Sequence, residues 1–217
     1  MSLQKPTCSG VILAGGLNTR MQGRNKAFLE VGGRAIVDRL IEILGTFFAE
    51  ILLVTRQPEL YAGRPIRVVE DIYAARAALT GIHAGLRHIQ TDFAFVVPCD
   101  APFIEPALIR SLLAELEPHL DVIVPMVDHF YEPLCAVYSK KCLPAIEEQL
   151  NRGDYKISRL FERIRLKTIP LEKIMQADAR KRAFFNVNTP EALAASRDMV
   201  QPQGAAGPKK RDPQDAS

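Results

Sequence analysis

The chain has 217 residues, of which 47% are hydrophobic and 24% charged, and its formal net charge at pH 7 is +3. These values exclude a collagen-like, coiled-coil or wholly disordered chain, and so small a net charge argues against a basic nucleic-acid-binding protein. At this length we expect one domain whose core needs neither a disulfide nor a metal.

Five short apolar runs rich in β-branched residues predict the strands of a sheet, and their near-continuous hydrophobicity is typical of strands covered on both faces. Between the runs, apolar residues recur with helical spacing, and Pro106 suits the first turn of one helix. In chain order the predicted elements are strand 10–13, helix 36–44, strands 51–55 and 66–70, helix 80–88, strand 93–98, helix 106–116 and strand 122–127. This alternation predicts an α/β fold with a doubly wound, mostly parallel sheet flanked by helices.

The second half of the chain is less regular but continues the pattern. Residues 134–138 predict a strand, 140–150 a helix and 166–170 a further short strand. We expect a last helix to begin after Thr189, whose side chain can cap it, with Pro190 in its first turn.

No internal repeat or long linker divides the chain. Residues 9–200 are therefore expected to form a single domain, preceded by a flexible N-terminus over 1–8 and followed by a disordered tail over 201–217 that lacks large apolar residues. The tail contains Lys209-Lys210-Arg211, but a run so short and so near acidic residues does not indicate nucleic-acid binding.

Cysteine and histidine usage indicates a reducing compartment without a structural metal site. The four cysteines, Cys8, Cys99, Cys135 and Cys142, form no CxxC pair, and the four histidines have no HxH or HExxH spacing. We expect Cys99 to pack in the interior rather than act as a nucleophile. No apolar run approaches the roughly 18 residues that span a bilayer, and residues 1–6 resemble no secretory signal. A cytoplasmic protein is expected.

The most informative segment follows the first predicted strand. In chain order it contains Leu13, Ala14, Gly15, Gly16, Arg20, Arg24 and Lys26. Glycines there let the backbone turn tightly and bring N–H groups close to an anion. From Gly15 to Arg34, four basic residues stand against the single acid Glu30. The segment is neither a Walker P-loop nor a GxGxxG turn, and on composition alone a loop with solvated charges fits equally well.

This segment reads L-A-G-G-x-x-x-R-M-x-G-x-x-K and resembles the nucleotidyltransferases of the sugar-nucleotide and molybdenum-cofactor type. Four later segments resemble the same family in the same order: Val69-Glu70-Asp71, Leu79-Thr80-Gly81-Ile82, Pro98-Cys99-Asp100-Ala101-Pro102-Phe103 and Phe185-Asn186-Val187-Asn188-Thr189-Pro190-Glu191. The closest resemblance is to the molybdenum cofactor guanylyltransferases. The chain departs from the family at Gln22 and at Ala77-Ala78, where the family has Gly-Pro, and the second change is expected to reshape the loop near the base.

The resemblance implies a Rossmann-like nucleotidyltransferase fold and the transfer of GMP from GTP to the terminal phosphate of molybdenum-molybdopterin, which releases pyrophosphate. Such an enzyme must hold two anions in line, neutralise developing charge and place a divalent cation. The implied cofactor is Mg²⁺. The implied partners are GTP and molybdenum-molybdopterin, with transient contact to molybdoenzymes or their chaperones, and with neither nucleic acid nor membrane.

Two acidic residues are expected to hold Mg²⁺, a cation that prefers oxygen ligands. Asp100 follows the run 93–98, and ligands of open α/β sheets bind beyond the carboxyl ends of strands. It lies too far before Pro106 to cap that helix simply. Asp71 ends the run 66–70, and the resemblance gives it nucleotide or metal contact, with a turn residue as the alternative.

The basic residues of the glycine-rich segment are candidates for phosphate binding. Lys26 suits the β- and γ-phosphates, and the planar guanidinium of Arg20 suits the α-phosphate or the acceptor's phosphate. Arg24 and Arg34 fit phosphate and solvent about equally. The predicted catalytic residues are Arg20, Lys26 and Asp100. The nucleotide-binding residues implied by the resemblance are Leu13, Ala14, Gly15, Gly16, Lys26, Asp71, Leu79, Gly81 and Asp100.

The acceptor side rests on three further residues. Asn186 and Asn188 alternate with Val187, so on an extended segment both amides face the same way and can bond a pterin or its phosphate. Turn and cap chemistry before the last helix is the alternative. The resemblance places Lys156 on the pterin side, although a solvated lysine fits the position almost as well.

Two other interpretations stay open. A CTP-using cytidylyltransferase acting on the same or another phosphorylated acceptor would share the motifs, and only the resemblance favours GTP. A non-catalytic module that binds GTP or the cofactor would not need both carboxylates together with Lys26.

Overall fold

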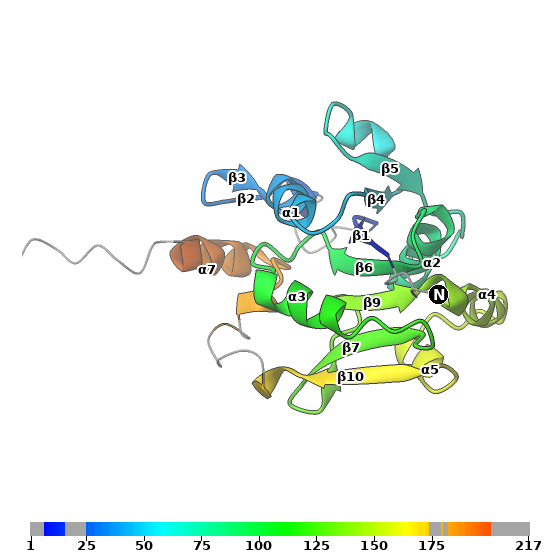
Figure 1. Cartoon of the computed structure of the whole chain (residues 1–217). Helices are drawn as coiled ribbons and strands as arrows, with labels where there is room; N and C mark the ends of the chain where they lie inside the picture. The colour runs from blue at the N-terminus through cyan, green and yellow to red at the C-terminus, as the bar shows by residue number, and fades with distance from the viewer. Residues whose placement is uncertain (1–6, 16–24, 174–178, 180–181, 201–217) are drawn as a thin grey trace, which may run out of the picture.

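The computed structural model describes residues 7–15, 25–173, 179 and 182–200, which form a twisted β-sheet with helices on both faces (Figure 1). In this described part the sheet has eight strands in the order β10-β7-β9-β6-β1-β4-β5, with β8 paired to β7. The strands are β1 (Cys8–Leu13), β4 (Ile51–Thr55), β5 (Arg67–Glu70), β6 (Phe93–Pro98), β7 (Val122–Val127), β8 (Phe130–Tyr131), β9 (Ala136–Ser139) and β10 (Leu166–Pro170).

The central strand β1 lies parallel to both β4 and β6, and the pairs β4–β5 and β7–β10 are also parallel. Within the described part of this sheet, only the pairs that involve β9 or β8 are antiparallel. All six residues of β6 are buried, as expected of a strand with helices on both faces. The predicted α/β fold with a mostly parallel sheet is confirmed.

Helices cover the two faces of the sheet separately. They are α1 (Ile36–Gly45), α2 (Ala78–His88), α3 (Pro106–Ala114), α4 (Leu143–Asn151), α5 (Ile157–Phe161) and α7 (Pro190–Val200). Successive residues of β1 point to opposite faces, so Ile12 packs with Leu40 of α1 and Leu112 of α3, and Val11 packs with residues of α2 and α4.

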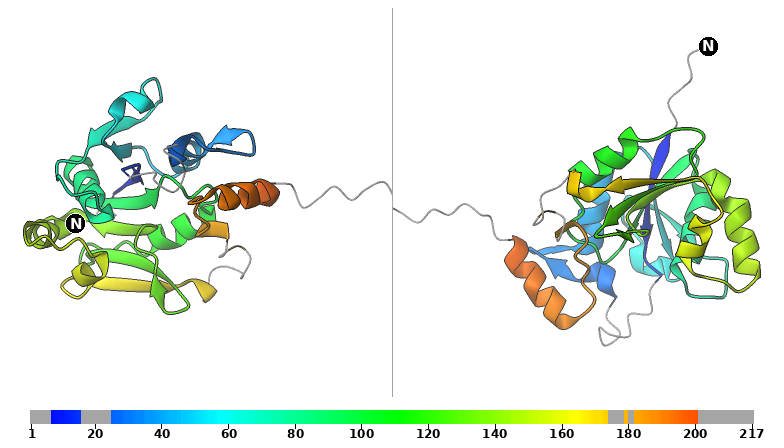
Figure 2. Two further views of the ribbon diagram at one scale, coloured as in Figure 1. Left: turned by 180° about the vertical axis from the view of Figure 1, so that it is seen from behind. Right: turned by 90° about the horizontal axis from the view of Figure 1, so that it is seen from below.

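A small hairpin of β2 (Glu30–Val31) and β3 (Arg34–Ala35) stands apart from the sheet. Its turn is Gly32-Gly33, and both residues have positive φ, as a two-residue type I′ hairpin turn requires. Helix α7 packs against β2, and both views of Figure 2 place the helix beside the hairpin. Helix α7 therefore contacts β2, in the segment that follows the glycine-rich segment along the chain.

In the second half of the chain, two predicted elements begin later than the sequence pattern indicated. The helix predicted over 140–150 is wrong at its start, because 140–142 form a 3-10 turn and α4 begins at Leu143 with Pro144 in its first turn. The strand predicted over 134–138 begins only at Ala136, since the N–H of Cys135 donates to the carbonyl of Glu132 at 3.1 Å and closes a turn.

Within the described residues, no helix is long and apolar enough to cross a bilayer. The four cysteines carry free thiols, as predicted.

Candidate active site

A cavity of about 330 Å³ opens at the carboxyl ends of β1, β4 and β6, in the size range of small-molecule sites. In an open α/β sheet this end of the strands is where ligands bind. Among the residues singled out from the sequence, the cavity is lined by Leu13, Gly15, Lys26, Asp71, Gly81, Asp100, Asn186 and Asn188. Segments that are far apart in the chain therefore meet at one site.

The polar centre of the cavity is Lys26. Its Nζ atom lies 3.1 Å from Oδ2 of Asp100 and also donates a hydrogen bond to Oδ1 of Asn188. The side chains of Lys26 and Asp100 are 18% and 16% exposed, so the ion pair is accessible from the cavity but shielded from bulk water. A basic residue of the glycine-rich segment and the aspartate after β6 therefore meet in this cavity.

The backbone fixes Lys26 on one side and Asn188 on the other. Lys26 opens the 3-10 helix η2 (Lys26–Phe28), which the side chain of Asn25 caps by accepting from the N–H of Ala27 at 3.0 Å. The buried Val187 donates its N–H to the carbonyl of Asp100 at 2.8 Å. This bond anchors the segment around Asn188 directly to the end of β6.

Both asparagines line the cavity on either side of buried Val187, as their alternation predicted. Capping is carried out by Thr189, whose hydroxyl accepts from the N–H of Ala192 at 3.2 Å at the start of α7. The side chain of Thr189 therefore caps α7, and the side-chain amides of Asn186 and Asn188 are not needed for this cap.

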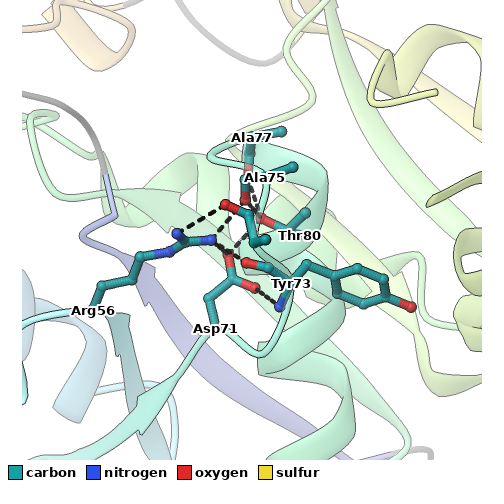
Figure 3. A network of polar contacts seen from close by, with 7 residues as sticks. Arg56, Asp71, Tyr73, Ala75, Ala77 and Thr80 are labelled. Atoms are coloured by element: carbon teal, nitrogen blue, oxygen red, sulfur yellow. Dashed lines mark hydrogen bonds and ion pairs between the residues drawn. The ribbon is translucent and has the colours of Figure 1, made fainter. Parts of the chain in front are cut away.

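Asp71 lies in the cavity wall but is mostly engaged with its own loop (Figure 3). Its carboxylate accepts from the N–H of Tyr73 at 3.0 Å and from the hydroxyl of Thr80, and it lies 3.6 Å from the guanidinium of Arg56. The Tyr73 bond is the turn chemistry weighed as the alternative for this residue. Nucleotide or metal contact by Asp71 remains a prediction.

Several other predicted residues lie elsewhere. Leu79 is fully buried in the core under α2, and Ala14 donates its N–H to Val54 at 2.8 Å within the sheet. Arg34 pairs with Glu42 on the surface, and exposed Lys156 precedes α5, outside the lining of this cavity. Gly16, Arg20 and Arg24 lie outside the described residues.

The sequence analysis missed two cationic lining residues, Arg56 and Arg76. Arg56 directly follows β4, so the rule that drew attention to Asp100 after β6 also applies to it. The helix-to-strand contact at Gly85 was also missed; a Cβ there would lie 2.7 Å from Cγ1 of Val11. Nothing in the spacing of apolar residues signals such a close approach.

Cys99 was expected to pack in the interior; it is partly buried against the core and also lines the cavity. Burial raises the pKa of its thiol to about 12, and the nearby Asp100 carboxylate acts in the same direction. The thiol therefore stays protonated at neutral pH and is no nucleophile. Its N–H donates to the carbonyl of Leu13 at 2.9 Å, which ties the ends of β1 and β6 together.

The donor set fits a magnesium ion that takes most of its ligands from elsewhere. The part of the chain that the structure describes contains no group of three or more acidic, histidine or cysteine side chains able to enclose a metal. Asp100 offers one carboxylate to the cavity, and Mg²⁺ is commonly bound by one or two carboxylates together with substrate phosphates and water.

Comparison of the sequence with known proteins shows which family the chain belongs to. Residues 10–169 match the family model described as the MobA-like NTP transferase domain. The chain belongs to this family. It is 37% identical over 193 residues to the molybdenum cofactor guanylyltransferase of Desulfosudis oleivorans, an alignment that covers 89% of this chain and 96% of that protein. It is 31% identical over 194 residues to the Vibrio cholerae protein of the same name, with 89% and 93% covered.

The fold of the family is seen in a solved structure as well. The crystal structure of molybdopterin-guanine dinucleotide biosynthesis protein A from Archaeoglobus fulgidus matches 88% of this chain and 97% of that chain, with a TM-score of 0.75 and 26% identity. The family resemblance and the nucleotidyltransferase assignment are thereby confirmed.

Proposed function

We propose that this chain transfers GMP from GTP to the terminal phosphate of molybdenum-molybdopterin, forming molybdopterin guanine dinucleotide and pyrophosphate. The observation that carries the proposal is the approach of Lys26 to within 3.1 Å of Asp100 in a cavity at the carboxyl ends of the strands. The names of the two curated relatives, which align over most of their length, support the guanylyl donor and the acceptor.

The reaction needs charge neutralisation and alignment rather than a covalent intermediate. The acceptor phosphate attacks the α-phosphorus, and the bond from that phosphorus to the β-phosphate oxygen breaks, so negative charge grows on the leaving pyrophosphate. The ammonium of Lys26 stabilises this charge, and the amides of Asn186 and Asn188 orient the acceptor beside it. Arg20, which lies outside the described residues, contacts the α-phosphate or the acceptor's phosphate.

Asp100 is the residue that would hold Mg²⁺, with Asp71 as the second candidate. Bound there, the ion would supply positive charge to the triphosphate oxygens. Lys26, which lies beside Asp100, places its ammonium next to this position, where it adds positive charge near the phosphates. We also propose that the reaction takes place in the cytoplasm, in keeping with the free thiols.

The test is pyrophosphate release from GTP in the presence of Mg²⁺ and purified molybdenum-molybdopterin as the acceptor. Turnover with GTP and loss of turnover in Asp100→Asn, with the fold intact, would support the proposal. Turnover with CTP but not GTP would reassign the chain as a cytidylyltransferase. Tight GTP binding without turnover with any acceptor would indicate a binding module, and undiminished activity of Asp100→Asn would remove the metal role.

A further inference from the structure

The connection between β5 and α2, residues 71–77, forms one wall of the cavity without regular secondary structure. It contributes Asp71, Arg76 and Ala77 to the lining. Few apolar contacts hold it, because Ile72 is 70% exposed and Ala74 is exposed. The sequence of this connection contains neither glycine nor proline, so no proline stiffens the backbone there.

Arg56 of the neighbouring strand end holds this connection through its backbone (Figure 3). Its guanidinium donates to three successive carbonyls, those of Tyr73, Ala74 at 3.1 Å and Ala75 at 2.7 Å. The same group lies 3.6 Å from the carboxylate of Asp71. The side chain is 26% exposed, so it reaches under the connection rather than into solvent.

Thr80 holds the connection from the side of α2. Its fully buried hydroxyl lies within hydrogen-bonding distance of the Asp71 carboxylate and of the Ala77 carbonyl, the latter at 2.8 Å. The ring of Tyr73 meets the buried His83 of the same helix edge-on, with the ring centres 5.0 Å apart. Side chains from the residue after β4 and from α2 therefore converge on one short piece of backbone.

From this network we infer that Arg56 is a positioning residue for the nucleotide, which acts by fixing the connection 71–77 as a preformed wall of the cavity. The inference rests on the proposed function for the identity of the nucleotide. A guanidinium spreads its N–H donors over two terminal nitrogens in one plane and so reaches three successive carbonyls, whereas the three donors of an ammonium share a single nitrogen.

Without Arg56, the connection would have to become ordered when the nucleotide binds. Ordering a segment at the moment of binding subtracts its entropy cost from the affinity. The chemical step would be affected far less, because Lys26 and Asp100 lie on other segments of the chain, Lys26 in η2 and Asp100 after β6.

The test compares Arg56→Met and Arg56→Lys with the control Arg67→Met. Arg67 of β5 also donates to a carbonyl, that of His88 at 3.1 Å, and pairs with Glu50 at 3.4 Å, but it does not line the cavity. We expect both Arg56 variants to raise the KM for GTP by about tenfold while kcat and the KM for the acceptor change by less than about threefold. The control should match the wild type.

Hydrogen exchange supplies the structural readout. In the ligand-free Arg56 variants the amides of residues 72–77 should exchange at least about tenfold faster, while those of β1 and β6 keep their protection. Faster exchange with an unchanged KM would overturn the inference, because the fixed wall would then not serve the nucleotide. Faster exchange throughout the chain, β1 and β6 included, with kcat and KM both impaired, would reduce Arg56 to a stability residue and overturn the inference as well.

A panel of the four triphosphates separates this inference from the proposed function. If the wild type uses CTP instead of GTP, the assignment of guanine as the base is wrong. The KM values of the wild type and the Arg56 variants are then compared with CTP, and this comparison still tests whether Arg56 positions the nucleotide. If the wild type binds none of the four, both proposals fall.

Discussion

At the scale of single residues, the site depends on how firmly Lys26 is held before any substrate arrives. Asn25 caps the turn that begins at Lys26 and also donates to the hydroxyl of Tyr61 at 3.3 Å. The ammonium itself meets Asp100 and Asn188. A charge that is placed in advance needs little reorganisation in the transition state, which is the condition under which electrostatic stabilisation is most effective.

We therefore predict that Lys26→Met lowers kcat for pyrophosphate release by about 100- to 1000-fold, in line with the loss of one preorganised donor to a developing anion. Lys26→Arg should retain more activity, because the positive charge remains. The matched control is Lys141→Met, since that ammonium contacts the carbonyl of Pro118 at 2.6 Å and does not line the cavity. A Lys26→Met variant that keeps kcat within threefold of the wild type would contradict the role given to this lysine.

The site residues that could be predicted from the sequence differ in their bonding partners from the one that was missed. Asp100 and Lys26 were predictable because a carboxylate after a buried strand and a lysine after paired glycines both bear a chemical signature. Arg56 also follows a strand, yet its partners are the carbonyls of residues 73–75, and backbone carbonyls are present in every sequence. A side chain whose function is to bind backbone can be recognised only once the loop conformation is known.

At the scale of elements, helix α2 lies unusually close to the central strand β1. A Cβ on Gly85 would be 2.7 Å from Cγ1 of Val11, a separation that real side chains do not tolerate, and a Cβ on Gly81 would be 3.2 Å from Leu13. Gly81 and Leu13 both line the cavity. The spacing of α2 from β1 thus sets the position of a cavity wall as well as the packing of the core.

We predict that Gly85→Ala destabilises the protein by about 1–3 kcal/mol, the usual cost of overpacking a core. Chemical denaturation measures this free energy of unfolding. Gly45→Ala in α1 is the matched control, because a Cβ there meets nothing closer than Ile51 at 4.0 Å, and it should be neutral or slightly stabilising. Val11→Ala combined with Gly85→Ala should recover part of the loss. Equal stability of the two single variants would show that α2 is not held at this spacing.

A second contact between elements, a salt bridge between Asp121 and Arg165, links the start of β7 to the start of β10. Asp121 accepts from the backbone N–H of Arg165 at 2.9 Å and from its guanidinium at 3.1 Å. Burial raises the pKa of Asp121, but the hydrogen bonds and charge of Arg165 outweigh it, so the pKa lies below its ordinary value. A carboxyl with a lowered pKa in the folded state stabilises the fold above its unfolded pKa of about 3.9 and loses this contribution as the pH falls through the folded pKa.

Asp121→Asn should accordingly lower the Tm at pH 7 by about 3–6 °C, and by progressively less as the pH falls below the unfolded pKa of about 3.9. Thermal melts of both proteins between pH 3 and pH 7 measure this difference. Glu148→Gln is the control, because Glu148 pairs with Arg152 and Arg163 on the surface, where ion pairs contribute little. A Tm difference between Asp121→Asn and wild type that does not shrink on acidification would contradict the titration of Asp121.

The strands of this fold were largely readable from the sequence, whereas its smaller elements were not. Apolar runs such as Phe93–Pro98 report burial on both faces, which a sheet between helix layers imposes. The hairpin of β2 and β3 has two residues per strand, and α5 has five, so none of these elements is long enough to repeat its apolar spacing over two periods. The predicted helix at Lys140 failed because apolar spacing does not encode the proline that delays its start.

At the scale of the whole molecule, the site extends beyond the part of the chain that the family model matches. That match covers residues 10–169, but Asn186 and Asn188 line the cavity, and Val187 bonds the carbonyl of Asp100. Helix α7 then packs against β2, close to the turn that carries Lys26. The C-terminal segment therefore closes the site by joining the end of β6 to the lysine segment.

This arrangement predicts opposite results for two truncations. A chain that ends at Val200 should release pyrophosphate within about twofold of the full-length rate, because residues 201–217, which the sequence predicts to be a disordered tail, carry no predicted site residue. A chain that ends at Phe184 loses Asn186, Asn188 and α7, and its kcat should fall by at least about 100-fold, since the partner of Lys26 and the bond to Asp100 are both gone. Circular dichroism of each truncation shows whether the sheet remains folded.

A double variant separates the packing of α7 from the chemistry of the site. Asn186→Ala combined with Asn188→Ala in the full-length chain removes both amides but keeps α7 in place. If that double variant retains full activity while the Phe184 truncation is folded and inactive, α7 serves the site by packing alone, and the role given to the two amides is wrong.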